Sequence, residues 1–221
     1  MRRPVVAIVA LVLLVLAGGR EAGAAMVADD PVTAMRDAAW RTRAWSYGMT
    51  IGPDGDAVTF DPHGDVMVLS RREQVLAFRV GDLAYLRIEV PDEPPWLCFD
   101  LSRTTVRNEV TMAFDLTSYA APGILTGVVA AERTRPGHYT GVIDIGSALE
   151  GNPGLVAAFD RDAAPVAFEA TLDRRGRLVW LAVDRKSMPR TEFRFSAYGE
   201  RVHVPMPPDD QIRVAAETFY G

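Results

Sequence analysis

The spacing of hydrophobic positions changes along the chain. Residues Val5–Ala17 are apolar without interruption, and from Pro31 to Arg43 apolar residues recur at helical spacing. Asp30 is a favourable N-cap residue, and proline is favoured in the first turn that follows a cap. After residue 43 the period becomes two, which is typical of β-strands. The pattern therefore predicts one amphipathic helix over residues 31–43, followed by a chain dominated by strands.

Five short β-rich runs follow this predicted helix, at residues 45–51, 57–60, 65–70, 75–80 and 83–90. The turns between them are rich in glycine, proline and aspartate, and Gly81-Asp82 is a two-residue hairpin signal in which glycine can adopt a positive φ. Short runs joined by tight turns predict an antiparallel meander.

The middle third of the chain has a mixed pattern. Residues 96–100 predict a short strand that carries Cys98, and residues 102–133 predict two short helices. A further strand is expected over residues 138–145, and a loop is expected around residues 151–154, with one helical turn through Phe159. This part of the chain connects two strand-rich regions.

The C-terminal third contains the clearest hairpin signal. Residues 166–172 alternate strictly, residues 173–176 read Asp-Arg-Arg-Gly, and residues 177–184 run back as a second strand. Further strands are predicted at residues 190–196 and 202–204, and the prolines that follow end the last of them.

These elements predict a single α+β domain with a large, curved antiparallel sheet and helices on one face. The strands at residues 83–90 and 177–184 are apolar on both faces, so they need cover on both. A ligand cavity between the sheet and the helices is one way to provide that cover. Strand alternation gives the residues expected to line such a cavity: Ile143, Phe168, Val179, Leu181, Phe193 and Phe195.

The uninterrupted apolar segment predicts export. Two arginines precede it, small residues follow it, and its 13 residues are too few for a membrane-spanning helix. We expect a signal peptide over residues 1–24, cleaved after Ala24 or Ala25, and one domain over residues 25–221 outside the cytoplasmic membrane. An uncleaved segment that tethers the protein is the alternative. Leu16-Ala17-Gly18 resembles the tripeptide before a lipidated cysteine, but Gly19 has no thiol to acylate.

Charge and cysteine content narrow the choice of function. The chain of 221 residues carries a formal net charge of −5, which argues against non-specific binding to nucleic acid. A single cysteine allows neither an internal disulfide nor a multi-cysteine metal site. Hydrophobic burial must therefore stabilise the fold.

No arrangement of residues indicates catalysis. No serine lies in a Gly-x-Ser-x-Gly motif, and the three histidines, His63, His138 and His203, lack the spacing of a zinc site. His63 lies in a Pro-His-Gly turn, and apolar neighbours predict a buried, inert thiol for Cys98. We therefore predict that the protein is not an enzyme and needs no metal or cofactor.

The run Phe193–Pro207 resembles the C-terminal segment of actinobacterial envelope lipoproteins of the LppX/LprG type, which have a LolA-like fold. Other segments agree with this family in order and spacing: Trp45-Ser46-Tyr47 after the first helix, Val80–Tyr85 followed by Trp96, Tyr139–Asp144, and Phe168–Leu178. The resemblance implies a half-barrel antiparallel sheet with helices packed on its concave face and a cavity that holds lipid acyl chains. It also implies a lipid anchor, but Gly19 replaces the acylated cysteine.

Together these observations predict a secreted, non-catalytic binder or carrier of a lipid or another hydrophobic molecule. The alternative is a cell-envelope module of the same fold that binds proteins or acts as a sensor. The expected partners are an apolar small molecule and, in addition, a membrane surface or envelope proteins, but not nucleic acid.

Overall fold

The computed structural model of the chain describes residues 30–52, 56–104, 121–150, 165–185, 188–204 and 206–220. The predicted signal segment, both cleavage positions, residues 105–120 of the predicted helical region and the predicted loop at residues 151–154 lie outside the described residues.

Helix α2 spans Pro31–Arg43, the residues that the sequence pattern predicts. The Asp30 side chain accepts hydrogen bonds from the backbone N–H groups of Val32 and Thr33, which satisfies donors that the first helical turn leaves free. One face of α2 is buried through Ala34, Met35, Ala38, Ala39 and Thr42. Local signals alone therefore define this helix.

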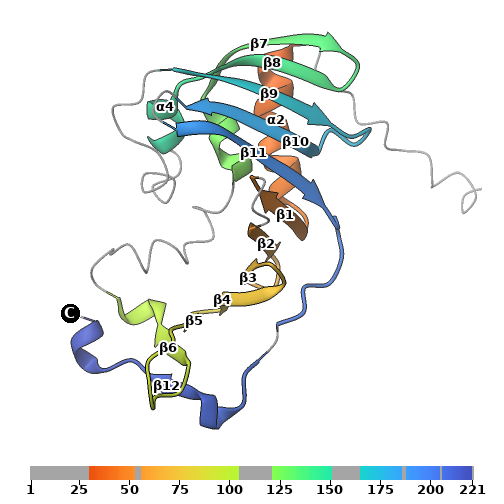
Figure 1. Ribbon diagram of the computed structural model, residues 1–221. Helices are drawn as coiled ribbons and strands as arrows, with labels where there is room; N and C mark the ends of the chain where they lie inside the picture. Colours follow the sequence, from red (N-terminus) through yellow and green to blue (C-terminus); the bar gives the residue numbers. More distant parts are fainter. Residues whose placement is uncertain are drawn as a thin grey trace, which may run out of the picture.

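Twelve strands form one large, mostly antiparallel open sheet, in the order β12-β6-β5-β4-β3-β2-β1-β11-β10-β9-β8-β7 (Figure 1). Among the strand pairs that the structure describes, only the contact between β12 and β6 is parallel. The strands are β1 (Tyr47–Ile51), β2 (Asp56–Asp61), β3 (Val66–Arg71), β4 (Gln74–Val80), β5 (Leu83–Arg87), β6 (Trp96–Asp100), β7 (Val128–Arg135), β8 (His138–Ile143), β9 (Val166–Leu172), β10 (Leu178–Arg185), β11 (Met188–Ser196) and β12 (Ile212–Val214).

The described residues contain few helices besides the sheet. Besides α2 there are α4 (Ile145–Glu150) and the 3₁₀ helices η1 (Leu101–Arg103), η2 (Ala121–Gly127), η4 (Asp209–Gln211) and η5 (Glu217–Phe219). Helix α2 packs against η2, β7 and β10, and α4 packs against η2. No helix among the described residues is long and apolar enough to cross a membrane.

The predicted meander is confirmed, because β1 to β6 pair in sequence with their neighbours. The hairpin between β4 and β5 turns at Gly81, which has φ +58°. The hairpin between β9 and β10 is also confirmed, and Gly176 closes its turn with φ +74°. Both glycines occupy the left-handed region that residues with a side chain rarely adopt.

Four segments differ from the predictions. Residues Val128–Arg135 form strand β7, so the helical prediction that extended to residue 133 is wrong there. This strand is a sheet edge and most of its side chains are exposed, so it lacks the alternation that marks a half-buried strand. Residues 202–204 do not form a strand. Their backbone does not join the sheet, and the side chains of Val202 and Val204 pack against apolar residues of β3 to β6. Helix α4 and strand β12 were not predicted.

The sheet carries apolar clusters on both faces. The larger cluster joins the helices to one face of the sheet, which we call the inner face. The smaller cluster lies on the opposite, outer face of β3 to β6 and contains Val66, Val68, Phe78, Tyr85 and Trp96. Val202 and Val204 pack against it. Strand β5 therefore buries Ala84 on the inner face and Tyr85 on the outer face, as its two apolar sides predict.

A bulge in β10 ties the sheet to α2. The register between β9 and β10 shifts between Leu178 and Trp180. Thr42 of α2, which is fully buried, accepts a 3.0 Å hydrogen bond from the Leu178 backbone N–H, and the Tyr198 hydroxyl donates a 2.6 Å hydrogen bond to the Leu178 carbonyl. Side chains thus satisfy buried backbone groups at the bulge.

Gly141 of β8 is required by close packing. A Cβ built at this position would lie 2.1 Å from the Ala130 carbonyl oxygen and 2.7 Å from a ring carbon of Phe168. We expect Gly141→Ala to lower the free energy of unfolding by about 1–3 kcal/mol, because overpacking displaces a strand and a core ring. Gly48→Ala in β1 is the matched control, since its Cβ would meet only ordinary contacts of 3.5 Å or more. Urea unfolding followed by circular dichroism measures both changes; equal stabilities would contradict the packing argument.

Candidate functional site: the inner face of the sheet

A continuous apolar row crosses seven neighbouring strands on the inner face. Each of these strands contributes one residue that pairs directly with the residue contributed by the adjacent strand. From β11 through β1 to β6 these residues are Phe195, Met49, Val58, Leu69, Ala77, Leu86 and Leu97. We call these seven residues the apolar row. With a strand spacing of about 4.8 Å the row spans about 29 Å, which is close to the hydrocarbon thickness of a bilayer, about 30 Å.

One end of the inner face is covered by helices. Met35 and Ala38 of α2, Ile124 and Leu125 of η2 and Ile145 of α4 are almost fully buried and belong to the same cluster as the inner-face side chains. Arg36 of α2 also donates hydrogen bonds of 3.1 and 2.7 Å to the Val128 carbonyl at the start of β7. These contacts hold the helical layer against this end of the sheet.

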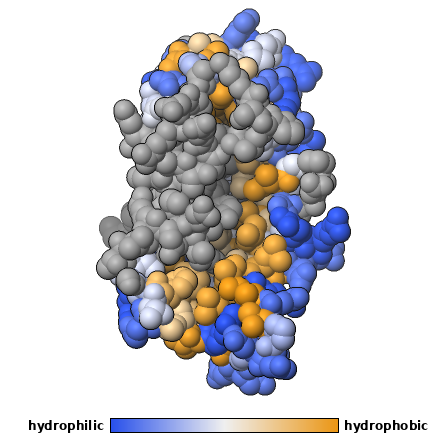
Figure 2. Space-filling view, turned by 60° about the vertical axis from the view of Figure 1, so that its left-hand side comes forward, coloured by the Kyte–Doolittle hydropathy of each residue, from blue (hydrophilic) through white to orange (hydrophobic). Residues whose placement is uncertain are grey.

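The other end of the row is less deeply buried. Phe195, Met49, Val58 and Ala77 are at most 5% exposed, whereas Leu69, Leu86 and Leu97 are only partly buried. Figure 2 shows apolar side chains gathered on the lower half of the molecule, the half that β4, β5, β6 and β12 form in Figure 1. Partly exposed leucines thus continue the line of fully buried core residues.

The structure places five of the six residues predicted to line a cavity in the larger apolar cluster. These are Ile143, Phe168, Leu181, Phe193 and Phe195, and each is at most 9% exposed. Their placement on the interior side of the sheet follows strand alternation. Of the five, Phe195 belongs to the apolar row.

The inward placement predicted for Val179 is wrong. Its side chain is 41% exposed, because the bulge between Leu178 and Trp180 interrupts the alternation on which the prediction depended. Leu178 and Leu181, on either side of the bulge, are fully buried instead.

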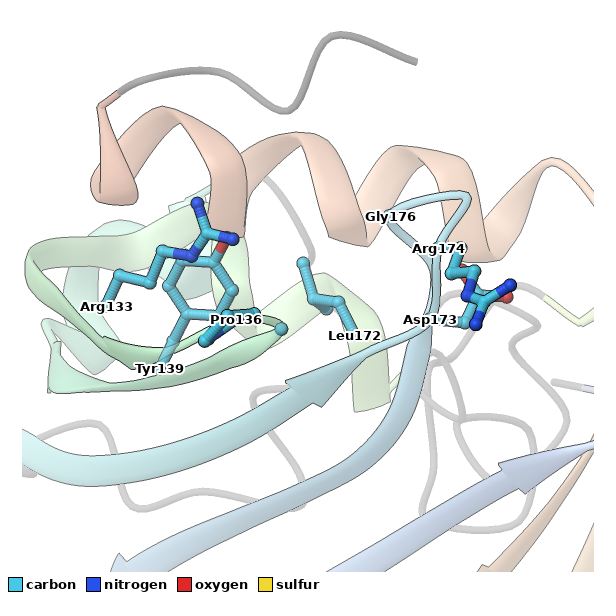
Figure 3. Close-up of a pocket in the computed structure, with 8 residues that line it drawn as sticks. Arg133, Pro136, Tyr139, Leu172, Asp173, Arg174 and Gly176 are labelled. Atoms are coloured by element: carbon cyan, nitrogen blue, oxygen red, sulfur yellow. The ribbon is translucent and has the colours of Figure 1, made fainter. Parts of the chain in front are cut away.

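A separate pocket with a volume of about 340 Å³ lies toward the other end of the sheet from the partly exposed leucines. It lies beneath α2, between the turn of the β7–β8 hairpin and the turn of the β9–β10 hairpin (Figure 3). Its lining consists of Arg133, Pro136, Gly137, Tyr139, Leu172, Asp173, Arg174 and Gly176. None of the residues predicted for the cavity lines this pocket.

Asp173 organises the wall of this pocket. Its carboxylate accepts hydrogen bonds from the backbone N–H groups of Arg175 (2.8 Å) and Arg177 (2.9 Å), and from Nε of Arg177 (2.8 Å). The Arg177 guanidinium in turn lies 4.2 Å from the centre of the Tyr198 ring. Burial of Asp173 opposes ionisation, but these hydrogen bonds and the Arg177 charge outweigh it and lower the pKa of the carboxyl group.

Removal of the Asp173 carboxylate should loosen this turn. We expect Asp173→Ala to lower the free energy of unfolding by about 1.5–3 kcal/mol, the usual range for hydrogen bonds to a charged group. The loss should shrink as the pH falls below about 4, because the native turn favours the ionised form and the wild type loses that stabilisation on protonation. Chemical unfolding at pH 7 and pH 3 measures both effects. Arg174→Ala, an exposed change in the same turn, is the control and should cost less than about 0.5 kcal/mol; equal losses would contradict this assignment.

The predicted polar candidates lie apart from one another. His63 lies in the turn between β2 and β3, where one of its ring nitrogens is 3.1 Å from the Ala44 carbonyl. His138 begins β8 beside Thr171, and His203 is exposed. Among the described residues, no group of three histidine, cysteine, aspartate or glutamate side chains could hold a metal ion.

Cys98 is partly buried and packs against the smaller cluster on the outer face. Burial raises the pKa of its thiol, although the hydrogen bond with Tyr85 acts in the opposite direction. A raised pKa leaves less of the reactive thiolate at neutral pH. The environment of Cys98 is thus that of a structural thiol, with more exposure than the sequence predicted.

A comparison with known proteins bears on the fold. No protein-family model and no curated protein matches the chain. A solved structure resembles it: the Mycobacterium tuberculosis lipoprotein LppX, at a TM-score of 0.41 and 16% sequence identity. The likeness covers 78% of this chain and 97% of that one. It is a likeness of fold.

The pocket beneath α2 could not be found by the search for catalytic motifs. Its residues come from two turns that are more than 30 positions apart, and they meet because β8 pairs with β9. The available signal was the run of arginines at residues 174, 175 and 177, combined with Arg133 and Arg135 in the other hairpin. The sequence pattern predicts the first of these segments only as a turn.

Proposed function

We propose that the protein is an exported, non-catalytic binder or carrier of a lipid or another apolar molecule. The apolar row is the observation that carries this proposal. The ligand lies along the inner face, in a curved half-barrel whose helices pack on the concave side. The domain that performs this function comprises residues 25–221, and residues 1–24 form the export signal.

The row supports an elongated apolar ligand for two reasons. It presents seven apolar side chains in one line, and its length of about 29 Å is that of the hydrocarbon core of a bilayer, which two acyl chains span end to end. Its partly exposed members, Leu69, Leu86 and Leu97, would gain from contact with a ligand, since burial of apolar surface contributes about 25 cal/mol per Å².

The first test is chemical. The protein is produced in cells from its full sequence and purified. It is then extracted with organic solvent, and the extract is analysed by mass spectrometry. We expect a bound lipid at a stoichiometry near one per chain. A protein that carries no lipid but copurifies with a stoichiometric envelope protein would instead support the alternative function, an interaction module.

The second test uses a matched pair of variants on β5. Leu86 faces the inner side of the sheet, whereas Leu83 is 43% exposed and lies on the opposite face. We expect Leu86→Asp to weaken binding of cis-parinaric acid, a fluorescent fatty acid, by more than about tenfold, because burying a carboxylate beside an acyl chain is costly. Leu83→Asp should bind within about twofold of the wild type.

A third variant distinguishes a loss of binding from a loss of folding. Leu86→Trp keeps the position apolar but fills space along the row, so we expect it to fold and to bind the fatty acid more weakly than the wild type. Folding of each variant is checked by circular dichroism. Equal affinities of Leu86→Trp, Leu83→Asp and the wild type would overturn the proposed site.

A further inference from the structure

Arginines gather at the end of the molecule that holds the pocket beneath α2. Three segments meet there. They are residues 36–45, which include the second half of α2 and the two residues after it, residues 132–139 of the β7–β8 hairpin, and residues 172–177 of the β9–β10 turn. They contain eight arginines and three carboxylates, which gives a balance of +5 in a chain whose net charge is −5. We call this surface the arginine–tryptophan face; its arginines are Arg36, Arg41, Arg43, Arg133, Arg135, Arg174, Arg175 and Arg177.

Contacts show that these segments are neighbours. A nitrogen of the Arg41 guanidinium lies 3.5 Å from the Arg175 carbonyl, and a Cβ built on Gly176 would touch the same guanidinium. Arg133 and Arg174 line one pocket and flank it on opposite sides (Figure 3). The positive charges therefore belong to one surface and not to three separate ones.

Several arginines elsewhere in the molecule pair with carboxylates. Arg71 pairs with Asp56 at 2.6 Å, Arg103 with Glu217 at 2.5 Å, and Arg190 with Glu169 at 2.9 Å. On the arginine–tryptophan face, Asp37 and Asp173 pair with Arg41 and Arg177. With eight arginines against three carboxylates, the face carries a net positive charge, which favours a partner that carries negative charge.

Two tryptophans on the same face are exposed to solvent. Trp40, on the outer side of α2, is 62% exposed, and Trp45, just after the helix, is 45% exposed. Arg43 lies 5.6 Å from the Trp40 ring centre, and Arg177 lies 6.0 Å from the Trp45 ring. Tryptophan prefers the boundary between lipid headgroups and acyl chains, because its ring is apolar and its N–H is polar.

We propose that the arginine–tryptophan face docks the protein onto the surface of a bilayer that contains anionic lipids. The arginines would lie at the level of the phosphates and the two tryptophans would enter the interface. Exposed tryptophans favour a membrane over an acidic protein or a nucleic acid, neither of which offers that boundary. Docking is a property of the outside of the molecule, and it does not require a ligand on the apolar row.

Vesicle flotation tests this proposal. Protein in the form that cells accumulate is mixed with vesicles of phosphatidylcholine alone or of phosphatidylcholine with phosphatidylglycerol. We expect binding to the mixed vesicles at least about tenfold stronger than to the neutral ones, decreasing as salt is added. Tryptophan fluorescence should shift to shorter wavelength on binding. Equal binding to both vesicle types would overturn the proposal.

Charge-reversed variants locate the surface. Arg174→Glu combined with Arg175→Glu should reduce binding to the mixed vesicles by at least about tenfold. Arg72→Glu combined with Arg194→Glu changes the net charge equally at exposed positions outside this face, and should bind within about twofold of the wild type. Equal losses in the two pairs, or stronger binding of the wild type to an oligonucleotide than to vesicles, would contradict membrane docking.

The tryptophans provide an independent readout. Trp40→Ser combined with Trp45→Ser should weaken vesicle binding and abolish most of the fluorescence shift, while the salt dependence remains. Lipid copurified with these variants is measured in parallel and should equal that of the wild type. Docking without bound lipid would refute only the proposed function, and bound lipid without docking would refute only this inference.

Discussion

Substitution of Phe78 by alanine should lower the free energy of unfolding by about 3–5 kcal/mol, the usual range for a buried phenylalanine. Phe78 lies in β4 on the outer face and is fully buried. Its ring stacks on Tyr85 with centres 4.5 Å apart and an angle of 13° between planes, and the Trp96 ring lies 5.3 Å away. Removing the ring would leave a cavity among aromatic neighbours that cannot close around it.

The effect should be specific to the interior of this outer cluster. Val80 lies two residues along the same strand and is 37% exposed, so Val80→Ala is a matched control with an expected loss below about 1 kcal/mol. Chemical denaturation at pH 7 measures both. A loss below about 1 kcal/mol for Phe78→Ala would mean that the outer cluster contributes little to stability.

The outer cluster explains why β5 is apolar on both sides without a ligand on each. One side faces the inner core, and on the other side Tyr85 belongs to a cluster with Phe78 and Trp96, against which Val202 and Val204 pack. Packing against other side chains is thus enough to explain why a strand buried on both faces is apolar throughout, and its composition does not require a ligand cavity on each face. A ligand is therefore proposed for the inner face alone.

An element can be predicted from the sequence when the residues that determine its structure lie within the element itself. Helix α2 was predicted to the residue because its cap, its proline and its buried stripe all lie within the segment itself. Strand β9 was equally clear, because alternate side chains from Val166 to Leu172 are buried. Strand β7 was not, since its hydrogen bonds to β8 are a tertiary feature and its exposed side chains carry no periodic signal.

The same reasoning applies to the candidate site. Alternation predicts that Ile143, Phe168 and Phe193 face a cavity, and the structure buries all three in the larger apolar cluster. It failed at Val179, because a bulge adds a residue to a strand without any local mark in the sequence. Sheet register, which sequence reasoning did not have, was needed to see that residues from seven strands form one row. Long-range pairing therefore decides the shape of the site.

Raising the pH above 10 should destabilise the protein steeply, because three tyrosines are held neutral in the fold. Burial raises the pKa of Tyr85 to about 12. Burial likewise raises the pKa of Tyr47 and of Tyr198 well above the ordinary value. In the unfolded chain each group ionises near pH 10. The stabilisation from the neutral native form is therefore complete below pH 10 and is lost as the pH rises toward the native values.

The slope of this loss gives the number of tyrosines involved. Around pH 11 the unfolded chain has lost most of three protons that the native protein retains, so the free energy of unfolding should fall there by up to about 4 kcal/mol per pH unit. Urea unfolding at fixed pH values measures this slope. Removal of one such hydroxyl should reduce the slope by about 1.4 kcal/mol per pH unit.

Two phenylalanine variants separate titration from hydrogen bonding. The Tyr47 ring packs beside the Phe60 and Phe195 rings, and its buried hydroxyl has no hydrogen-bond partner among the described residues. Tyr47→Phe should therefore keep or increase stability at pH 7, and should also flatten the alkaline slope. Tyr198→Phe should flatten the slope equally but cost about 1 kcal/mol at pH 7, because the hydrogen bond to the Leu178 carbonyl is lost. An unchanged slope in both variants would show that the alkaline loss comes from other groups.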